Sequence, residues 1–113
     1  MEIELIVNEK NVTLILGAEL HDHHVTGNVP LDVESQHILD DSIENCLERG
    51  LIYVLLDLKN VDYCDSTGLG VIFDANKAIQ KVNGSLKVKN LSTDVARLFS
   101  ITKMTDVVDV VSS

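Results

Sequence analysis

The sequence predicts an α/β domain in which a mixed sheet of four to five strands starts with an antiparallel hairpin and is flanked by three or more α-helices. Two strand-like runs around a polar turn open the chain, a continuous apolar run occupies its middle, and segments with helical spacing lie between and after them. The chain has 113 residues, of which 45% are hydrophobic, as in a compact domain. We therefore expect residues 1–113 to form a single domain.

The hairpin is predicted by two runs rich in β-branched residues. Ile3, Leu5 and Val7 alternate with their neighbours, and residues 12–16 form a second run after the polar turn at residues 8–11. The first two strands are expected to be antiparallel neighbours.

The following segments predict a surface loop and a first helix. Residues 21–30 are polar and contain Gly27 and Pro30, which favours an irregular connection. From Val33 onward apolar residues recur at helical spacing, and Gly50 can end the helix in a left-handed conformation. The apolar positions of this helix are Leu39, Ile43, Cys46 and Leu47.

A central strand and a second helix come next. Residues 51–56 are continuously apolar, which is typical of a strand covered on both faces in the middle of a parallel sheet. The second helix carries an apolar stripe and can end at Gly84, and residues 85–89 supply the next strand. The stripe consists of Leu69, Ile72, Phe73, Asn76 and Ile79.

The last part of the chain predicts a short third helix and a final edge element. Ser92 or Thr93 can cap this helix, because both side chains accept backbone N–H bonds. Its apolar positions are Val95, Leu98 and Phe99. The valines within residues 107–111 favour a small edge strand or a last turn.

The charge and the apolar runs exclude several classes of partner. With 18 acidic against 9 basic residues the net charge is -9, which repels nucleic acids and anionic membranes. The longest apolar run, residues 51–56, falls far short of the ~20 residues of a membrane-spanning helix. Acids stand at the start of the chain where a secretory signal carries bases. We expect a cytoplasmic protein, without membrane insertion or a nucleic-acid partner, in which Cys46 and Cys64 are free thiols.

Residues 57–72 deliver an exposed serine to the start of the second helix. Asp65, Ser66 and Thr67 are all residue types that cap helices. Gly68 and Gly70 each cost up to ~1 kcal/mol relative to alanine inside a helix, so their presence requires another reason. Bare backbone here lets a kinase or a partner surface approach Ser66 closely, which makes Ser66 the candidate functional residue.

A phosphate on Ser66 is expected to act as a binding switch. It adds about -1.5 to -2 charges beside Asp65, and the positive end of the helix dipole tolerates it. One like-charge contact with a partner at ~4 Å costs about 4 kcal/mol at an effective dielectric of about 20. That energy corresponds to roughly a thousandfold in affinity, so no large conformational change is needed.

The run from Asp65 to Gly70 resembles the signature of bacterial anti-sigma factor antagonists of the STAS family. In that signature, aspartate, serine, serine or threonine, glycine, leucine and glycine follow a buried strand, and the serine accepts phosphate. The resemblance extends to the hairpin, the turn at residues 17–20, the central strand, Gly84 and residues 95–99. It implies a STAS-like fold.

The resemblance also implies a function. Proteins of this kind are not enzymes. In the unphosphorylated form they bind a serine kinase that doubles as an anti-sigma factor, and the sigma factor is released. Phosphorylation at the position of Ser66 ends this binding, and a serine phosphatase restores it. The ATP belongs to the kinase, so the chain is expected to need no cofactor.

The partner-binding surface is expected to gather around Ser66. Five neighbours of Ser66 would form or shape it, and an aspartate before the first helix would contribute from the adjoining loop. The neighbours are Asp65, Thr67, Gly68, Leu69 and Gly70, and the aspartate is either Asp22 or Asp32.

Other chemistry is less well supported by the residues. The histidine-rich stretch at residues 21–24 has no second cluster to complete a metal site, so a polar loop is favoured. Cys64 is flanked by acids, which disfavour a thiolate, and we expect a structural thiol. A hydrolase elbow would place glycine on both sides of Ser66, whereas Cys64 stands on one side. We therefore expect no catalytic residues and no metal.

Two alternative functions stay open. A receiver-like domain could accept phosphate on Asp57 or Asp62, but a receiver alternates strands and helices, and here the first strand leads directly into another strand. The second alternative is a STAS binding module of a transporter or a stress-signalling scaffold that has no phosphoswitch.

Overall fold

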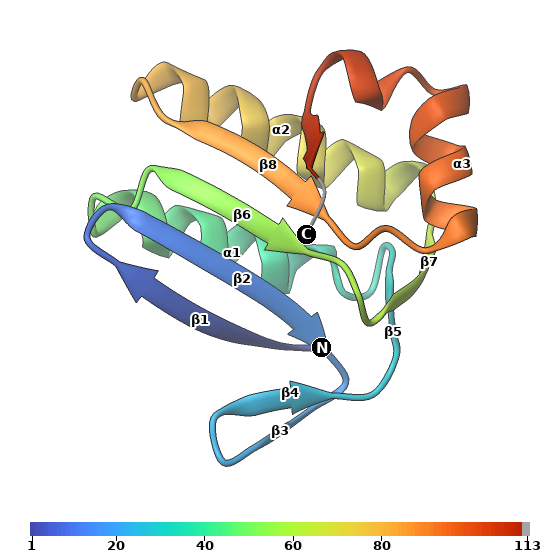
Figure 1. Ribbon diagram of the computed structural model, residues 1–113, viewed down its shortest axis with the longest axis horizontal. Coiled ribbons are helices and arrows are strands. Elements are labelled where there is room, and N and C mark those ends of the chain that lie inside the picture. The colour runs from blue at the N-terminus through green and yellow to red at the C-terminus, as the bar shows by residue number, and fades with distance from the viewer. Residues whose placement is uncertain (112–113) are drawn as a thin grey trace.

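The computed structural model describes residues 1–111, which form one central five-stranded sheet, two small two-stranded sheets and the helices that pack against them (Figure 1). The elements in chain order are β1 (Glu2–Asn8), β2 (Asn11–Gly17), β3 (Glu19–His21), β4 (His24–Thr26), β5 (Val29–Leu31), α1 (Gln36–Glu48), β6 (Tyr53–Asp57), β7 (Val61–Cys64), α2 (Ser66–Lys81), β8 (Ser85–Lys89), α3 (Thr93–Ile101), the 3₁₀ helix η1 (Met104–Asp106) and β9 (Asp109–Val111).

The central sheet has the strand order β1-β2-β6-β8-β9. The β1–β2 pair is antiparallel, whereas β2, β6, β8 and β9 run parallel to one another. The predicted mixed sheet with an opening hairpin is confirmed, and β6 is its middle strand. Of the two options for the C-terminal valines, the edge strand is the one that forms.

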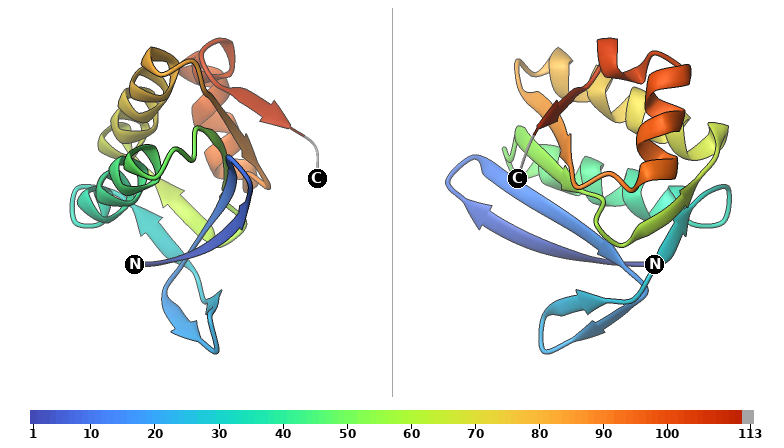
Figure 2. Two further views of the ribbon diagram at one scale, coloured as in Figure 1. Left: turned by 90° about the vertical axis from the view of Figure 1, so that its left-hand side faces the viewer. Right: turned by 45° about the vertical axis from the view of Figure 1, so that its right-hand side comes forward.

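The core lies between the sheet and the helices α1 and α2, which cover the same face (Figure 2). Leu39, Ile43 and Cys46 are buried on α1, as the helical spacing predicted. The stripe predicted for α2 is buried except at Phe73, which is 39% exposed. Phe73 lies under the ammonium group of Lys77, which is 5.5 Å from the ring centre.

The opposite face of the sheet is partly uncovered, and the prediction that residues 51–56 are covered on both faces is wrong. Tyr53 is 42% exposed and Leu55 is only partly buried. A shallow groove crosses this face, lined by side chains from β2, β6 and β8. The face stays open because α1 and α2 both lie behind the sheet, and α3 packs against β7 instead.

The segment at residues 21–30 is ordered, so the prediction of an irregular loop is wrong. It contributes to a projecting hairpin, β3–β4, and to β5, which pairs in parallel with β7. The two-residue turn at Asp22 and His23 has φ angles of 49° and 69°, which both residue types adopt more readily than most. A turn without glycine gave no strong hairpin signal in the sequence.

Helix ends follow the predictions at two positions and differ at one. Gly50 has a φ of 77°, and Ser92 accepts the Val95 N–H at 3.2 Å, as expected for a C-terminal glycine and an N-cap. Gly84 does not end α2, because Asn83 adopts the left-handed conformation with a φ of 63°. Glycine is required at 84 because a Cβ atom there would collide with the Ile52 carbonyl oxygen.

The start of α2 is packed against β5. A Cβ atom at Gly68 would collide with the carbonyl oxygen of Leu31 and lie 2.9 Å from Cys64 Sγ. A Cβ atom at Gly70, two residues later, would have no heavy atom within 4 Å. The two glycines therefore have different roles, and only Gly68 permits the close approach of helix and strand.

We expect opposite stability changes for Gly68→Ala and Gly70→Ala. The first should lower the free energy of unfolding by about 1–3 kcal/mol, because the backbone carbonyl of Leu31 must move. The second should raise it by up to about 1 kcal/mol through the higher helix propensity of alanine. Urea denaturation of both variants checks this, and equal stabilities would contradict the packing described here.

The Glu4 carboxylate fastens the β3–β4 hairpin to β1. It accepts the Val25 N–H at 2.9 Å and lies 3.2 Å from His24 Nδ1, with its side chain only 11% exposed. The Val25 hydrogen bond is the main cause that lowers the pKa of Glu4 below its ordinary value of 4.5, with His24 adding to it and burial opposing it. A lowered pKa in the folded protein means that this contact stabilises the hairpin above pH 4.5.

We expect the contact to be lost as the pH falls through the lowered pKa of Glu4. The amide resonance of Val25 should therefore titrate with a midpoint below 4.5 in the folded protein, as followed by NMR. Glu4→Gln should abolish this titration. A midpoint at or above 4.5 would show that the carboxylate does not hold the hairpin.

Candidate functional site

Ser66 is the first residue of α2 and is exposed, directly after the end of β7. Asp65, not Ser66, is the N-cap, and its carboxylate accepts the Gly68 N–H at 3.0 Å. Within residues 1–111 the Ser66 hydroxyl has no hydrogen-bond partner. The hydroxyl is therefore free to react or to meet a partner.

The predicted neighbours of Ser66 divide into an exposed set and a buried set. Asp65, Thr67 and Gly70 are partly exposed, whereas Gly68 and Leu69 are buried. The expectation that both glycines leave bare backbone at the surface holds for Gly70 and is wrong for Gly68. The two buried residues shape the site by fixing the first turn of α2.

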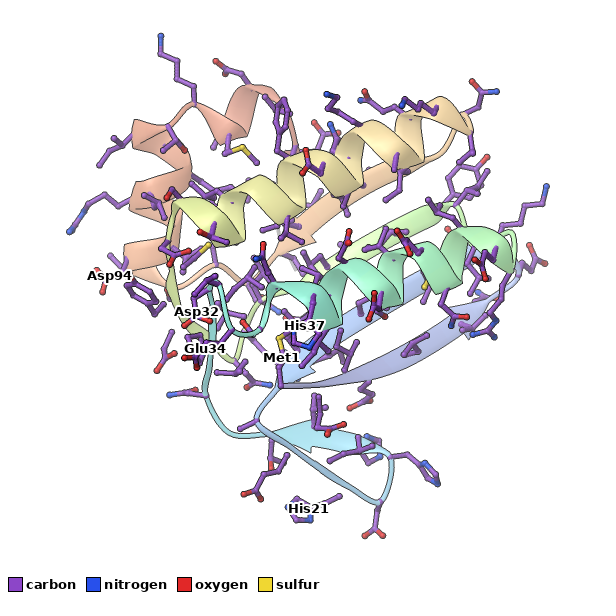
Figure 3. The ribbon with its side chains drawn as sticks, turned by 180° about the vertical axis from the view of Figure 1, so that it is seen from behind. Met1, His21, Asp32, Glu34, His37 and Asp94 are labelled. Atoms are coloured by element: carbon purple, nitrogen blue, oxygen red, sulfur yellow. The ribbon has the colours of Figure 1, made fainter. Side chains whose placement is uncertain are left out.

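Of the two candidate aspartates, the structure brings Asp32 to the site. Asp32 follows Leu31, whose carbonyl contacts the first turn of α2, and its carboxylate accepts the Glu34 N–H at 3.1 Å. Asp22 lies at the tip of the β3–β4 hairpin. Figure 3 shows its neighbour His21 well apart from Asp32.

The surroundings of the site are acidic. No lysine or arginine occurs in residues 11–48 or 60–76, the two stretches that build the site. Asp32 and Glu34 come from the β5–α1 loop, and Asp94 comes from the start of α3. Figure 3 shows these three carboxylates on one side of the molecule. A partner with basic side chains suits this face.

Cys64 is a structural thiol, as expected from its acidic flanks. Burial, with Asp65 as a second cause, raises the pKa of Cys64 to about 12, so the thiol stays protonated. Its Sγ packs against Gly68 and lies 3.6 Å from the Asp65 carbonyl oxygen, to which it donates. Burial also raises the pKa of Cys46, and both cysteines are free.

The features of a receiver domain are not found. The first strand forms an antiparallel pair with the second, as the sequence predicted. Asp57 is 4% exposed and holds the loops after β6 and β8 together, because its carboxylate accepts the Lys59 N–H and the Asn90 side-chain amide. In residues 1–111 no three His, Cys, Asp or Glu side chains are placed to bind one metal ion.

No helix in the described residues 1–111 has the length and apolar character to cross a bilayer.

Sequence reasoning missed three exposed apolar residues on the strands and the loop that adjoin the start of α2. Pro30, Val33 and Tyr63 lie on β5, on the β5–α1 loop and on β7. Val33 is 64% exposed and Tyr63 is 55% exposed. The alternation of Tyr63 with Cys64 could have indicated an outward tyrosine, but β7 was not recognised as a strand.

The chain is similar in sequence to one known family of proteins. Residues 18–113 match the family model of the STAS domain. The anti-sigma-B factor antagonist of Bacillus subtilis is 41% identical over 100 residues, which cover 88% of this chain and 91% of the relative. The anti-sigma-B factor antagonist of Listeria monocytogenes is 39% identical over 110 residues, which cover 97% of this chain and 90% of the relative.

Solved structures share the fold at low sequence identity. The crystal structure of the Thermotoga maritima protein TM1081 superposes with a TM-score of 0.81 at 22% identity, over 98% of this chain and 86% of that one. The anti-sigma factor antagonist SpoIIAA in its unphosphorylated form superposes with a TM-score of 0.76 at 14% identity, over 99% of this chain and 88% of that one. The family match, the 41% identical relative and the common fold together show that this chain belongs to the STAS domain family.

Proposed function

We propose that this protein is an anti-sigma factor antagonist whose unphosphorylated form binds a serine kinase that acts as an anti-sigma factor, so that a sigma factor is released. Phosphorylation of Ser66 ends the binding, and a serine phosphatase restores it. The observation that carries the proposal is the exposed Ser66 hydroxyl, which Asp65 leaves free by taking the capping role. The chain acts as one binding unit, residues 1–113, in the cytoplasm, and it is not an enzyme.

The geometry around Ser66 suits a phosphoryl acceptor. A kinase must bring the γ-phosphate of ATP to within about 3–3.5 Å of the acceptor oxygen. Ser66 is exposed, and Gly70 on the next turn adds no side chain that would obstruct the approach. The ATP is bound by the kinase, so the antagonist itself needs no cofactor.

The fold tolerates the phosphate. Ser66 stands at the N-terminus of α2, where free backbone N–H groups and the positive end of the helix dipole favour an anion. The position is exposed, so no buried contact is lost when the phosphate is added. We therefore expect phosphorylated and unphosphorylated protein to have the same fold.

The phosphate weakens binding through like-charge repulsion. It adds about -1.5 to -2 charges at the point where the kinase presents the phosphates of its own nucleotide. One such contact at ~4 Å costs about 4 kcal/mol at an effective dielectric of about 20, or roughly a thousandfold in affinity. Asp65 adds a further negative charge next to the phosphate.

The relatives support this proposal. Two curated proteins that match most of the chain are named anti-sigma-B factor antagonists. SpoIIAA, which shares the fold, is described in an unphosphorylated and a phosphorylated form, and the phosphorylated form superposes on this chain with a TM-score of 0.70. A protein of this fold therefore exists in a phosphorylated form, which supports a phosphorylated form of this chain.

Binding of proteins from the source cells tests the switch. Ser66→Ala should capture an ATP-binding kinase as well as the wild type does, whereas Ser66→Asp should lose it. Ser100→Asp is the matched control, because it adds a charge to another exposed serine on α3 and should bind normally. Mass spectrometry identifies the captured proteins. Equal capture of a transporter or a scaffold by all baits would reject the switch and favour a constitutive binding module.

Phosphate transfer to the purified protein provides a second test. Incubation with the captured kinase and Mg-ATP should add one phosphate, and peptide mapping should place it on Ser66. Ser66→Ala should abolish the incorporation, whereas Thr67→Ala should leave most of it, because Thr67 is partly buried. Incorporation that survives Ser66→Ala would assign the acceptor to another residue.

A further inference from the structure

A bulge in β7 turns an aromatic side chain outward in the strand that leads to Ser66. In the β5–β7 pair, Val29 stands opposite Val61 and Pro30 stands opposite Tyr63, so Asp62 is an extra residue. Both Asp62 and Tyr63 are exposed, whereas Val61 and Cys64 on either side of them are buried. Bulges commonly re-aim a side chain beside a functional site. This one places Tyr63 in solvent, three residues before Ser66.

Two more exposed apolar residues lie on β5 and in the loop that follows it. Pro30 is exposed opposite Tyr63 in the β5–β7 pair, and Val33 is 64% exposed in the loop that follows β5. Their buried neighbours Leu31 and Cys64 contact Gly68 in the first turn of α2. The exposed apolar residues and Ser66 are therefore attached to the same packed junction.

Carboxylates alternate with these apolar residues. Asp32 and Glu34 flank Val33, and Asp62 precedes Tyr63. The two stretches that build this face, residues 11–48 and 60–76, carry no lysine or arginine. These two stretches therefore carry charge of one sign, and Arg97 on the neighbouring α3 lies 3.9 Å from Asp94. The complement of the two stretches is a basic surface with an apolar centre.

We infer that Pro30, Val33 and Tyr63 form an apolar anchor by which the kinase partner of the proposed function holds this face, with lysine or arginine side chains of the partner around it. The inference rests on the proposed function and extends it to residues outside the Ser66 motif. Tyrosine is enriched among the residues that dominate binding energy, particularly where it fills a pocket inside a polar rim. The anchor supplies affinity, and the phosphate on Ser66 opposes it.

The test measures the affinity of the variants for one purified probe, the kinase that the wild-type protein captures from its source cells. Tyr63→Ala should weaken binding at least about tenfold, as for an interface residue that dominates the energy. Tyr63→Phe keeps the ring and should stay within about threefold of the wild type. Val82→Ala is the matched control, because Val82 is 45% exposed at the far end of α2 and should have no effect. Thermal unfolding of each variant verifies that the fold is kept.

The outcomes separate this inference from the proposed function, because Ser66→Asp is measured beside the anchor variants. If Ser66→Asp loses binding and Tyr63→Ala binds like the wild type, the anchor is rejected and the switch stands. If Ser66→Asp binds like the wild type, or the wild type does not bind, the proposed function is rejected. The alternative partner at this surface is a second copy of the chain, and sedimentation of the protein alone tests for it. A dimer that dissociates in Tyr63→Ala would assign the anchor to self-association and reject the kinase as its partner.

Discussion

The contact between Gly68 and the carbonyl group of Leu31 is the constraint on which the site depends. It brings the first turn of α2 against β5, and β5 is paired with β7, which leads into the helix. One tight backbone contact thereby joins the segment before α1 to the segment that carries Ser66. Any side chain at position 68 would push these segments apart and displace Ser66.

The site combines a neutral hydroxyl with an acidic surround, and this combination suits a modification switch. Asp65 is the N-cap and accepts the Gly68 N–H, so the Ser66 hydroxyl makes no capping contact that a phosphate would break. A phosphate on the exposed Ser66 would change the surface charge without breaking a buried contact. The proposed anchor around Tyr63 does not include Ser66, so affinity and regulation are assigned to different side chains of one face.

Much of the framework could be predicted from the sequence, because it depends on local periodicity. The opening hairpin, the three helices, the central strand and the Ser92 cap all carry local signals. The missed features depend on contacts between distant segments. A two-residue turn without glycine concealed the β3–β4 hairpin, and the packing that requires glycine at 68 involves a strand more than thirty residues earlier. The outward Tyr63 was missed because β7 was not recognised as a strand, and the bulge in its pairing with β5 involves residues about thirty positions apart.

The central claim is that the phosphate on Ser66 changes an interface while the fold stays the same. Backbone amide spectra of the unphosphorylated and the Ser66-phosphorylated protein test it most directly. The account predicts shifts confined to the start of α2 and the adjacent β5–α1 loop, with unchanged resonances in β1, β2 and the end of α2. Shifts that spread through the central sheet would contradict it, because the switch would then act through a rearrangement of the fold.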